Sequence, residues 1–218
     1  MKERILQFLF PPKCVLCRKL LSREETDLCH DCRELQPEYG THKIKLSFLA
    51  QWTGLWYYKE NVRLSILRYK FAGRRSYAAA YGRLLAMKLM KEGWDTPDML
   101  TWVPISRQRK RKRGYDQVEL FGKVLAKELG KLSGIKLDDK MLVRVKNTKP
   151  QKELSDKERN NNIESAFQIR INDLKYSKVI LVDDIYTTGA TINECAKVLL
   201  DGGVGKVYFI TACIGNGF

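Results

Sequence analysis

Two adjacent acids follow a run of apolar residues in the segment VILVDDIYTTGAT, residues 179–191. The apolar run predicts a buried strand, and Asp183 and Asp184 stand at its carboxyl end. In an open parallel sheet, ligands bind beyond this end of the strands. We therefore expect the two carboxylates to accept hydrogen bonds from vicinal hydroxyl groups, such as those of a ribose, or to hold a hydrated Mg²⁺ nearby.

A turn rich in hydroxyl groups comes directly after the acids. It consists of Thr187, Thr188, Gly189, Ala190 and Thr191. The glycine lets the backbone approach a ligand closely, the threonines add donors, and the helix that follows offers its first N–H groups to an anion. The turn therefore predicts a phosphate site. An acidic helix N-cap with incidental threonines is the alternative, although a cap needs only one acid.

Four cysteines near the amino end form two Cys-x-x-Cys pairs, which are Cys14 with Cys17 and Cys29 with Cys32. This spacing predicts one tetrahedral, structural Zn²⁺, whose binding would supply the folding energy of residues 11 to about 40. Four unligated thiols, packed or redox-active, are the alternative. We expect His30 and His42 to be polar surface residues, and Cys195 and Cys213 to lie in the core.

Positive charge is concentrated in the middle of the chain. The net charge is +15, and residues 101–150 hold fourteen Lys and Arg against five Asp and Glu. The densest part, Arg107 to Arg113, has six basic residues in seven positions. Such clustering favours a polyphosphate or nucleic acid ligand. A well-solvated basic face is the alternative.

The periodicity of the apolar residues predicts the elements that position these groups. They are a strand at 55–58, a helix ending near Gly73, a helix over 77–89, a strand from Met99 into a loop that carries the basic run, a helix over 118–132 that stops at Gly134, a strand from Met141, and a final strand–helix–strand unit. That unit makes the sheet parallel. The polar segment 146–162 predicts a long exposed loop. We expect an α/β fold with a zinc-binding four-cysteine module at 1–45 and a second domain at 46–218.

The cellular setting follows from segments that the chain lacks. No apolar stretch reaches the length of a transmembrane helix. The first ten residues carry no small-residue cleavage site, which predicts a mature N-terminus. Six cysteines without an export signal indicate reduced thiols. We therefore expect a cytoplasmic protein without membrane insertion.

The segment VILVDDIYTTGAT also resembles the phosphoribosyl diphosphate (PRPP) binding motif of type I phosphoribosyltransferases. Together with LFPPKC, ILRYKFAG, VPISRQRKRKRGYDQ and PQKELSDKERNNNIESAF, in their order along the chain, it is similar to the ComF family of late-competence proteins. This resemblance covers nearly the whole chain. It implies a zinc-finger and phosphoribosyltransferase-type protein needed for natural transformation, acting on incoming single-stranded DNA beside a helicase-like ATPase.

The resemblance also implies roles for single residues. Asp183 and Asp184 would bind the ribose hydroxyls, 187–191 the 5′-phosphate, and VPIS would hold the pyrophosphate. Arg113, Gly114, Tyr115 and Gln117 match the family's Arg-Gly-Phe-Asn-Gln signature, in which Asp116 replaces asparagine and would oppose a pyrophosphate. A second motif is matched by Gln151, Leu154, Ser155, Arg159, Asn162, Ala166 and Phe167, with Glu153 and Ser165 in place of glycines.

Two hypotheses from different classes remain. The favoured one is a PRPP-binding module for DNA uptake, with Arg107, Arg109, Lys110, Arg111 and Lys112 holding single-stranded DNA and the zinc module as a possible further contact. The alternative is an active transferase that moves ribose 5-phosphate from Mg²⁺-bound PRPP to a base or amine. Asp183 and Asp184 would be its catalytic residues, and Arg113 would bind PRPP.

Overall fold

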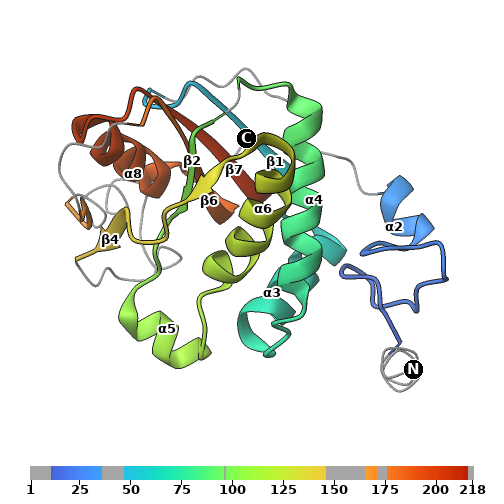
Figure 1. Ribbon diagram of the computed structural model, residues 1–218. Coiled ribbons are helices and arrows are strands. Elements are labelled where there is room, and N and C mark those ends of the chain that lie inside the picture. Colours follow the sequence, from blue (N-terminus) through green and yellow to red (C-terminus); the bar gives the residue numbers. More distant parts are fainter. Residues whose placement is uncertain (1–10, 36–46, 96, 146–164, 171–175, 216–218) are drawn as a thin grey trace.

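A five-stranded parallel sheet forms the centre of the computed structural model, which describes residues 11–35, 47–95, 97–145, 165–170 and 176–215 (Figure 1). Its strand order is β1-β7-β6-β2-β3. The strands are β1 (Gln51–Tyr57), β2 (Met99–Trp102), β3 (Lys136–Leu137), β6 (Lys178–Tyr186) and β7 (Lys206–Ile214). The predicted α/β class is confirmed, and the carboxyl ends of the parallel strands share one edge of the sheet.

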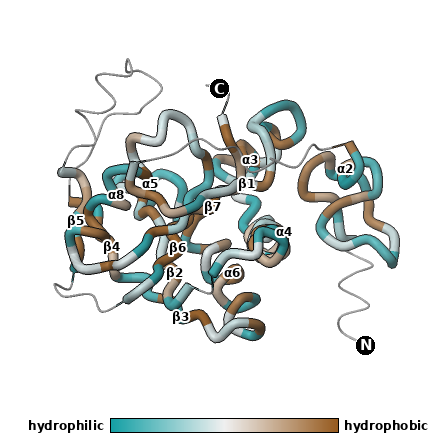
Figure 2. The backbone as a smooth tube through the Cα atoms, turned by 90° about the horizontal axis from the view of Figure 1, so that it is seen from above, coloured by the Kyte–Doolittle hydropathy of each residue, from teal (hydrophilic) through white to brown (hydrophobic). Residues whose placement is uncertain are grey.

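Helices cover both faces of this sheet (Figures 1 and 2). The helices are α3 (Glu60–Phe71), α4 (Tyr77–Glu92) and α6 (Gln117–Ser133) on one face, and α8 (Ala190–Asp201) on the other. In β6, Ile180 and Val182 pack with the first group, whereas Val179 and Leu181 pack with α8. Because both faces are buried, the strand is a continuous apolar run rather than an alternating one.

The segment between β2 and β6 differs from the prediction in two ways. The basic run is not a loop but the helix α5 (Arg107–Arg113). Ser106 caps it by accepting a hydrogen bond from the Arg109 N–H, Gly114 ends it in the left-handed conformation, and Lys and Arg favour helices. The predicted strand after Met141 is β4 (Leu142–Arg144), but it pairs antiparallel with β5 (Phe167–Ile169) in a separate two-stranded sheet.

The zinc module, residues 11–35 of the described chain, packs against α3 and α4. It contains a turn closed by the bridge between Lys13 and Leu20, and the helix α2 (His30–Leu35). Ser65 Oγ of α3 donates a hydrogen bond to the Val15 carbonyl at 2.6 Å, and Arg68 of the same helix donates to the Leu16 carbonyl. The module and the larger domain therefore share one apolar core.

Several predictions lie outside the described residues. They are the exposed loop 146–162, the surface position of His42, and the part of the second motif before Ser165. The boundary at 45–46 also falls within the segment 36–46, which lies outside the described residues. Within the residues that the structure does describe, no helix combines the length and apolar character that crossing a bilayer requires.

Candidate functional site

A cavity of about 380 Å³ lies at the carboxyl edge of the sheet. Segments from five places in the sequence line it: the end of α3, the loop after β2 with α5, the first residue of α6, the strand β4, and the end of β6 with the start of α8. Asp183, Asp184 and the turn 187–191 all line this cavity. The structure therefore brings together the acids and the hydroxyl-rich turn that the sequence singled out.

The hydroxyl-rich turn leads into the amino end of α8. Gly189 is the N-cap residue, with φ of 79°, a conformation that side chains other than glycine rarely adopt. A Cβ atom at this position would also lie 2.8 Å from the Tyr186 hydroxyl. Both constraints require glycine here. The first residues of α8, Ala190 to Ile192, line the cavity, and a helix N-terminus favours an anion.

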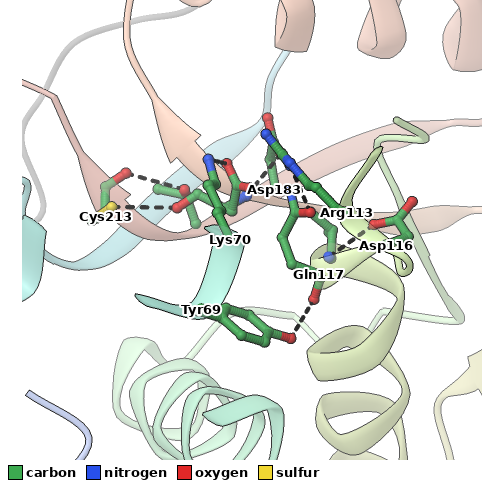
Figure 3. Close-up of polar contacts among 10 residues, drawn as sticks. Tyr69, Lys70, Arg113, Asp116, Gln117, Asp183 and Cys213 are labelled. Atoms are coloured by element: carbon green, nitrogen blue, oxygen red, sulfur yellow. Dashed lines mark hydrogen bonds and ion pairs between the residues drawn. The ribbon is translucent and has the colours of Figure 1, made fainter. Parts of the chain in front are cut away.

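Asp184 is held by the protein itself. Lys70 Nζ lies 2.8 Å from its Oδ1, and Gln117 Nε2 donates a hydrogen bond to its Oδ2. Burial would raise the pKa of Asp184, but the Lys70 charge and these hydrogen bonds outweigh it and hold that pKa below its ordinary value. Figure 3 shows the surrounding network, in which Gln117 also accepts from Arg113 Nη1 at 2.7 Å. Asp184 therefore links α3, α6 and β6.

Asp183 has a different environment. It is half-buried, lines the cavity, and accepts a hydrogen bond at 2.8 Å from the backbone N–H of Asp184. Burial, and then the charge of Asp184, raise the pKa of Asp183 to about 8. The sequence predicted one role for both acids, and both line the cavity, but Lys70 and Gln117 engage only the side chain of Asp184.

Four basic side chains line the same cavity. They are Lys70, Arg109, Arg113 and Arg144. The guanidinium of Arg113 also lies 5.1 Å above the centre of the Phe71 ring. Burial, and then the charge of Arg109, lower the pKa of Arg144 to about 10. Positive charges that repel one another in a half-enclosed space indicate a site for a ligand with several negative charges.

Helix α5 divides the basic run between two surfaces. Arg109 and Arg113, one helical turn apart, are half-buried at the cavity. The side chains of Arg107, Lys110, Arg111 and Lys112 are exposed. Lys110 Nζ forms an ion pair with Glu119 Oε2 at 2.7 Å. Arg109, which the sequence grouped with the predicted DNA-binding residues, lines the same cavity as Asp183 and Asp184.

Asp116 does not line the cavity. It is 5% exposed and caps α6, because its Oδ1 accepts hydrogen bonds from the N–H groups of Val118 and Glu119 at 2.9 and 3.2 Å. Its Oδ2 accepts a third, from the Ile105 N–H at 3.4 Å. The acid that replaces asparagine in the family signature thus serves the helix terminus.

The four cysteines form a site that fits zinc. Their Sγ atoms all lie within 4.8 Å of one another, and those of Cys17 and Cys29 are 3.6 Å apart. Four Zn–S bonds of about 2.3 Å in a tetrahedron place the sulfur atoms about 3.8 Å apart. The Lys19 N–H also donates to Cys17 Sγ at 3.4 Å. His30 is 81% exposed, as predicted for a surface residue.

Comparison with known proteins gives the same two parts. A model of the double zinc ribbon domain matches residues 5–42, and a model of the phosphoribosyl transferase domain matches residues 119–217. A structure of glutamine PRPP amidotransferase from B. subtilis, complexed with ADP and GMP, has a TM-score of 0.40 and 18% identity, and covers 66% of this chain and 30% of that one.

Two curated relatives extend over most of the chain. Competence protein F of Haemophilus influenzae is 29% identical over 218 residues, which are 89% of this chain and 93% of that protein. DNA utilization protein YhgH of Salmonella typhimurium is 31% identical over 160 residues, which are 72% of this chain and 68% of that protein. This chain therefore belongs to the ComF family, which includes competence protein F and the YhgH proteins, and joins a four-cysteine zinc ribbon to a phosphoribosyltransferase-type domain.

Proposed function

We propose that this protein binds PRPP in the cavity at the sheet edge, and that it acts on single-stranded DNA in the cytoplasm during DNA uptake. One observation carries the first part: one cavity combines a helix N-terminus with threonine hydroxyls, the half-buried Asp183 carboxylate and four basic side chains. The names of the relatives, competence protein F and DNA utilization protein, support the second part.

Each group of PRPP has a matching part of the cavity. The 5′-phosphate fits the turn 187–191 at the start of α8, and the ribose hydroxyls fit Asp183. The pyrophosphate fits Arg109, Arg113 and Arg144, because guanidinium groups bind phosphate through paired hydrogen bonds. Mg²⁺ would accompany the pyrophosphate, since this cation is often bound through phosphate oxygens.

Calorimetric titration tests this assignment. PRPP should bind to the purified protein at least tenfold more tightly than ribose 5-phosphate or pyrophosphate alone, because each fragment fills only part of the cavity. Equal affinities for PRPP and pyrophosphate would mean that the cavity recognises only charge. If no PRPP binding can be measured, the proposed PRPP-binding function is wrong.

Ligand affinity should also depend on pH through Asp183. Because burial and the charge of Asp184 raise the pKa of this carboxyl above its ordinary value, part of it is protonated in the neutral range, and it must lose that proton to accept two hydroxyl hydrogen bonds. PRPP affinity should therefore rise with pH, by up to tenfold per unit below the raised pKa, and level off above it. Asp183→Asn should bind weakly with no such rise. The affinity for pyrophosphate, which lacks hydroxyl groups, is measured over the same pH range. It is the control for changes in the protonation of the ligand's phosphate groups.

The transferase alternative gains from one observation, which is the position of Asp116. Because this acid caps α6 and does not line the cavity, it does not face a pyrophosphate there. In such a reaction, the bond from ribose C1 to the pyrophosphate oxygen breaks, an acceptor nitrogen bonds to C1, and the arginines stabilise the departing charge. Pyrophosphate release from PRPP that requires a base or amine acceptor would establish turnover.

For the DNA part, the exposed face of α5 supplies Arg107, Arg111 and Lys112, which lie outside the PRPP cavity. Their charges suit the phosphates of a single strand. A helicase-like ATPase is the protein partner implied by the resemblance to the ComF family. The two ligands would therefore occupy different sides of α5.

A further inference from the structure

A second cavity, of about 880 Å³, lies between the zinc module and the start of α4. We call it the zinc-module groove. Its basic residues are Lys13, Arg18 and Arg23 of the zinc module, and Arg74 and Arg83 around the start of α4. Tyr77, a half-buried aromatic residue, also lines it. The function proposed above uses none of these residues.

The acids of the groove are already engaged. Asp27 accepts two hydrogen bonds from the Arg83 guanidinium, one of them from Nε at 2.9 Å. Glu25 accepts hydrogen bonds from the backbone N–H groups of Ser22 and His30 at 2.8 and 2.6 Å. No carboxylate within the described part of the chain pairs with Lys13, Arg18, Arg23 or Arg74, and all four are exposed. The groove therefore has a clear excess of positive charge.

The α3–α4 turn, residues 72–76, connects this groove to α5. Arg74 lines the groove, while the next residue, Arg75, donates a hydrogen bond from Nη2 to the Gly114 carbonyl at 3.0 Å, at the end of α5. The Arg75 guanidinium also lies 4.9 Å above the Tyr115 ring. In both Figure 1 and Figure 2, α3 lies between α5 and the zinc module. The α3–α4 turn thus contacts both basic surfaces, through Arg74 and Arg75.

We infer that the zinc-module groove is the main binding site for single-stranded DNA, and that the strand continues over the α3–α4 turn onto the exposed face of α5. Proteins that bind single strands combine a basic groove that follows the phosphates with aromatic rings that stack on bases. Lys13, Arg18, Arg23 and Arg74 provide the first feature, and Tyr77 the second. The inference rests on the proposed DNA-binding function and adds where the strand lies.

Three variants, each lacking three positive charges, test the inference. The groove variant carries Arg18→Gln, Arg23→Gln and Arg74→Gln. The α5 variant carries Arg107→Gln, Arg111→Gln and Lys112→Gln. The control variant carries Lys136→Gln, Lys197→Gln and Lys206→Gln, three exposed lysines that line none of the cavities described above. Fluorescence anisotropy measures the affinity for a labelled oligothymidylate at several salt concentrations. Zinc content and PRPP affinity show whether each variant is folded.

The groove variant should bind the oligonucleotide about tenfold more weakly or worse at 0.1 M salt. Its plot of log affinity against log salt should be flatter by about 2, since each lost phosphate contact removes about 0.7 from the slope. The α5 variant should lose less, and the control variant little. A groove variant that binds like wild type would overturn the inference and leave DNA binding in place. A wild-type protein that binds no oligonucleotide would remove the DNA function as well.

Two further ligands test the chemistry of the groove. Duplex DNA of equal length should bind more weakly than the single strand, because paired bases cannot stack on Tyr77. Inorganic polyphosphate should compete less well than an oligonucleotide with the same number of phosphates, since it has no bases. Equal binding of all three ligands would show a general polyanion site and overturn the assignment to single strands.

Discussion

Replacing Asp184 with asparagine should destabilise the fold by about 3 kcal/mol, the cost of removing one partner of a buried ion pair. The variant side chain keeps the size of aspartate, but it leaves the Lys70 ammonium without its carboxylate. The side chain of Lys70 is only 13% exposed and shares the cavity with Arg109 and Arg113. Because the whole chain has 218 residues, the melting temperature should fall by roughly 6 to 12 °C.

Asp183→Asn provides the matched comparison, since it makes the same chemical change one residue earlier. Asp183 has no ion pair in the described structure, and its charge is disfavoured by burial and by Asp184. This variant should keep its melting temperature and lose PRPP affinity. Asp184→Asn should have both a lower melting temperature and a lower PRPP affinity. Thermal unfolding and calorimetric titration of the two variants decide the matter. Equal melting temperatures for both would show that Lys70 and Asp184 do not form a stabilising pair.

The partner of Asp184 can be tested in the same way. Lys70→Met removes the cation and keeps most of the apolar side chain. In the presence of Asp184→Asn it should restore part of the lost stability, because no unpaired charge then remains buried. A double variant whose loss equals the sum of the two single losses would mean that the residues act independently.

The contiguous part of the site could be predicted from the sequence. Asp183, Asp184 and the turn 187–191 follow one another along the chain, so that a strand end and a helix start fix their positions without any long-range contact. The four-cysteine site could also be predicted from the sequence, because two Cys-x-x-Cys pairs of fixed spacing define a tetrahedral metal site. The final strand–helix–strand unit was also predicted, and it has the parallel pairing that such a connection requires.

The rest of the site depends on contacts between distant segments. Lys70 and Arg144 reach the cavity from α3 and β4, and no local pattern distinguishes them from other basic residues. The division of the run 107–113 follows from its helical form, which directs residues 109 and 113 to one side. Asp116 illustrates a further difficulty, since an acid before a helix can either cap it or face a ligand. Only the orientation of α6 decides between these roles.

Ser165 shows how the structure explains a departure from the family motif. It stands where the family resemblance has glycine, and its φ is 55°, in the region that favours glycine. Its backbone N–H donates to Glu194 Oε1 of α8 at 2.7 Å, which holds the residue there. The substitution is thus accommodated in the backbone conformation that glycine would adopt.

Loss of zinc should have the largest effect on the fold. Zinc binding contributes about 10–16 kcal/mol in small zinc-finger peptides at pH 7, and the zinc module has little apolar material of its own. Purified protein should contain close to one zinc per chain. Cys29→Ser should lower both the zinc content and the soluble yield, whereas Cys195→Ala, which alters a core cysteine, should leave the zinc content unchanged.

The effect of zinc loss should extend beyond the module, because the module covers part of α3 and α4. Val15, Leu16 and Leu28 are 2%, 0% and 5% exposed, so unfolding the module would bring their apolar partners on these helices into contact with water. Ser65, which is fully buried, would also lose the Val15 carbonyl as its hydrogen-bond acceptor. Chelation should therefore lower the melting temperature of the whole chain, as measured by circular dichroism. A metal-free protein that stays soluble and melts at the same temperature would show that the module does not depend on zinc.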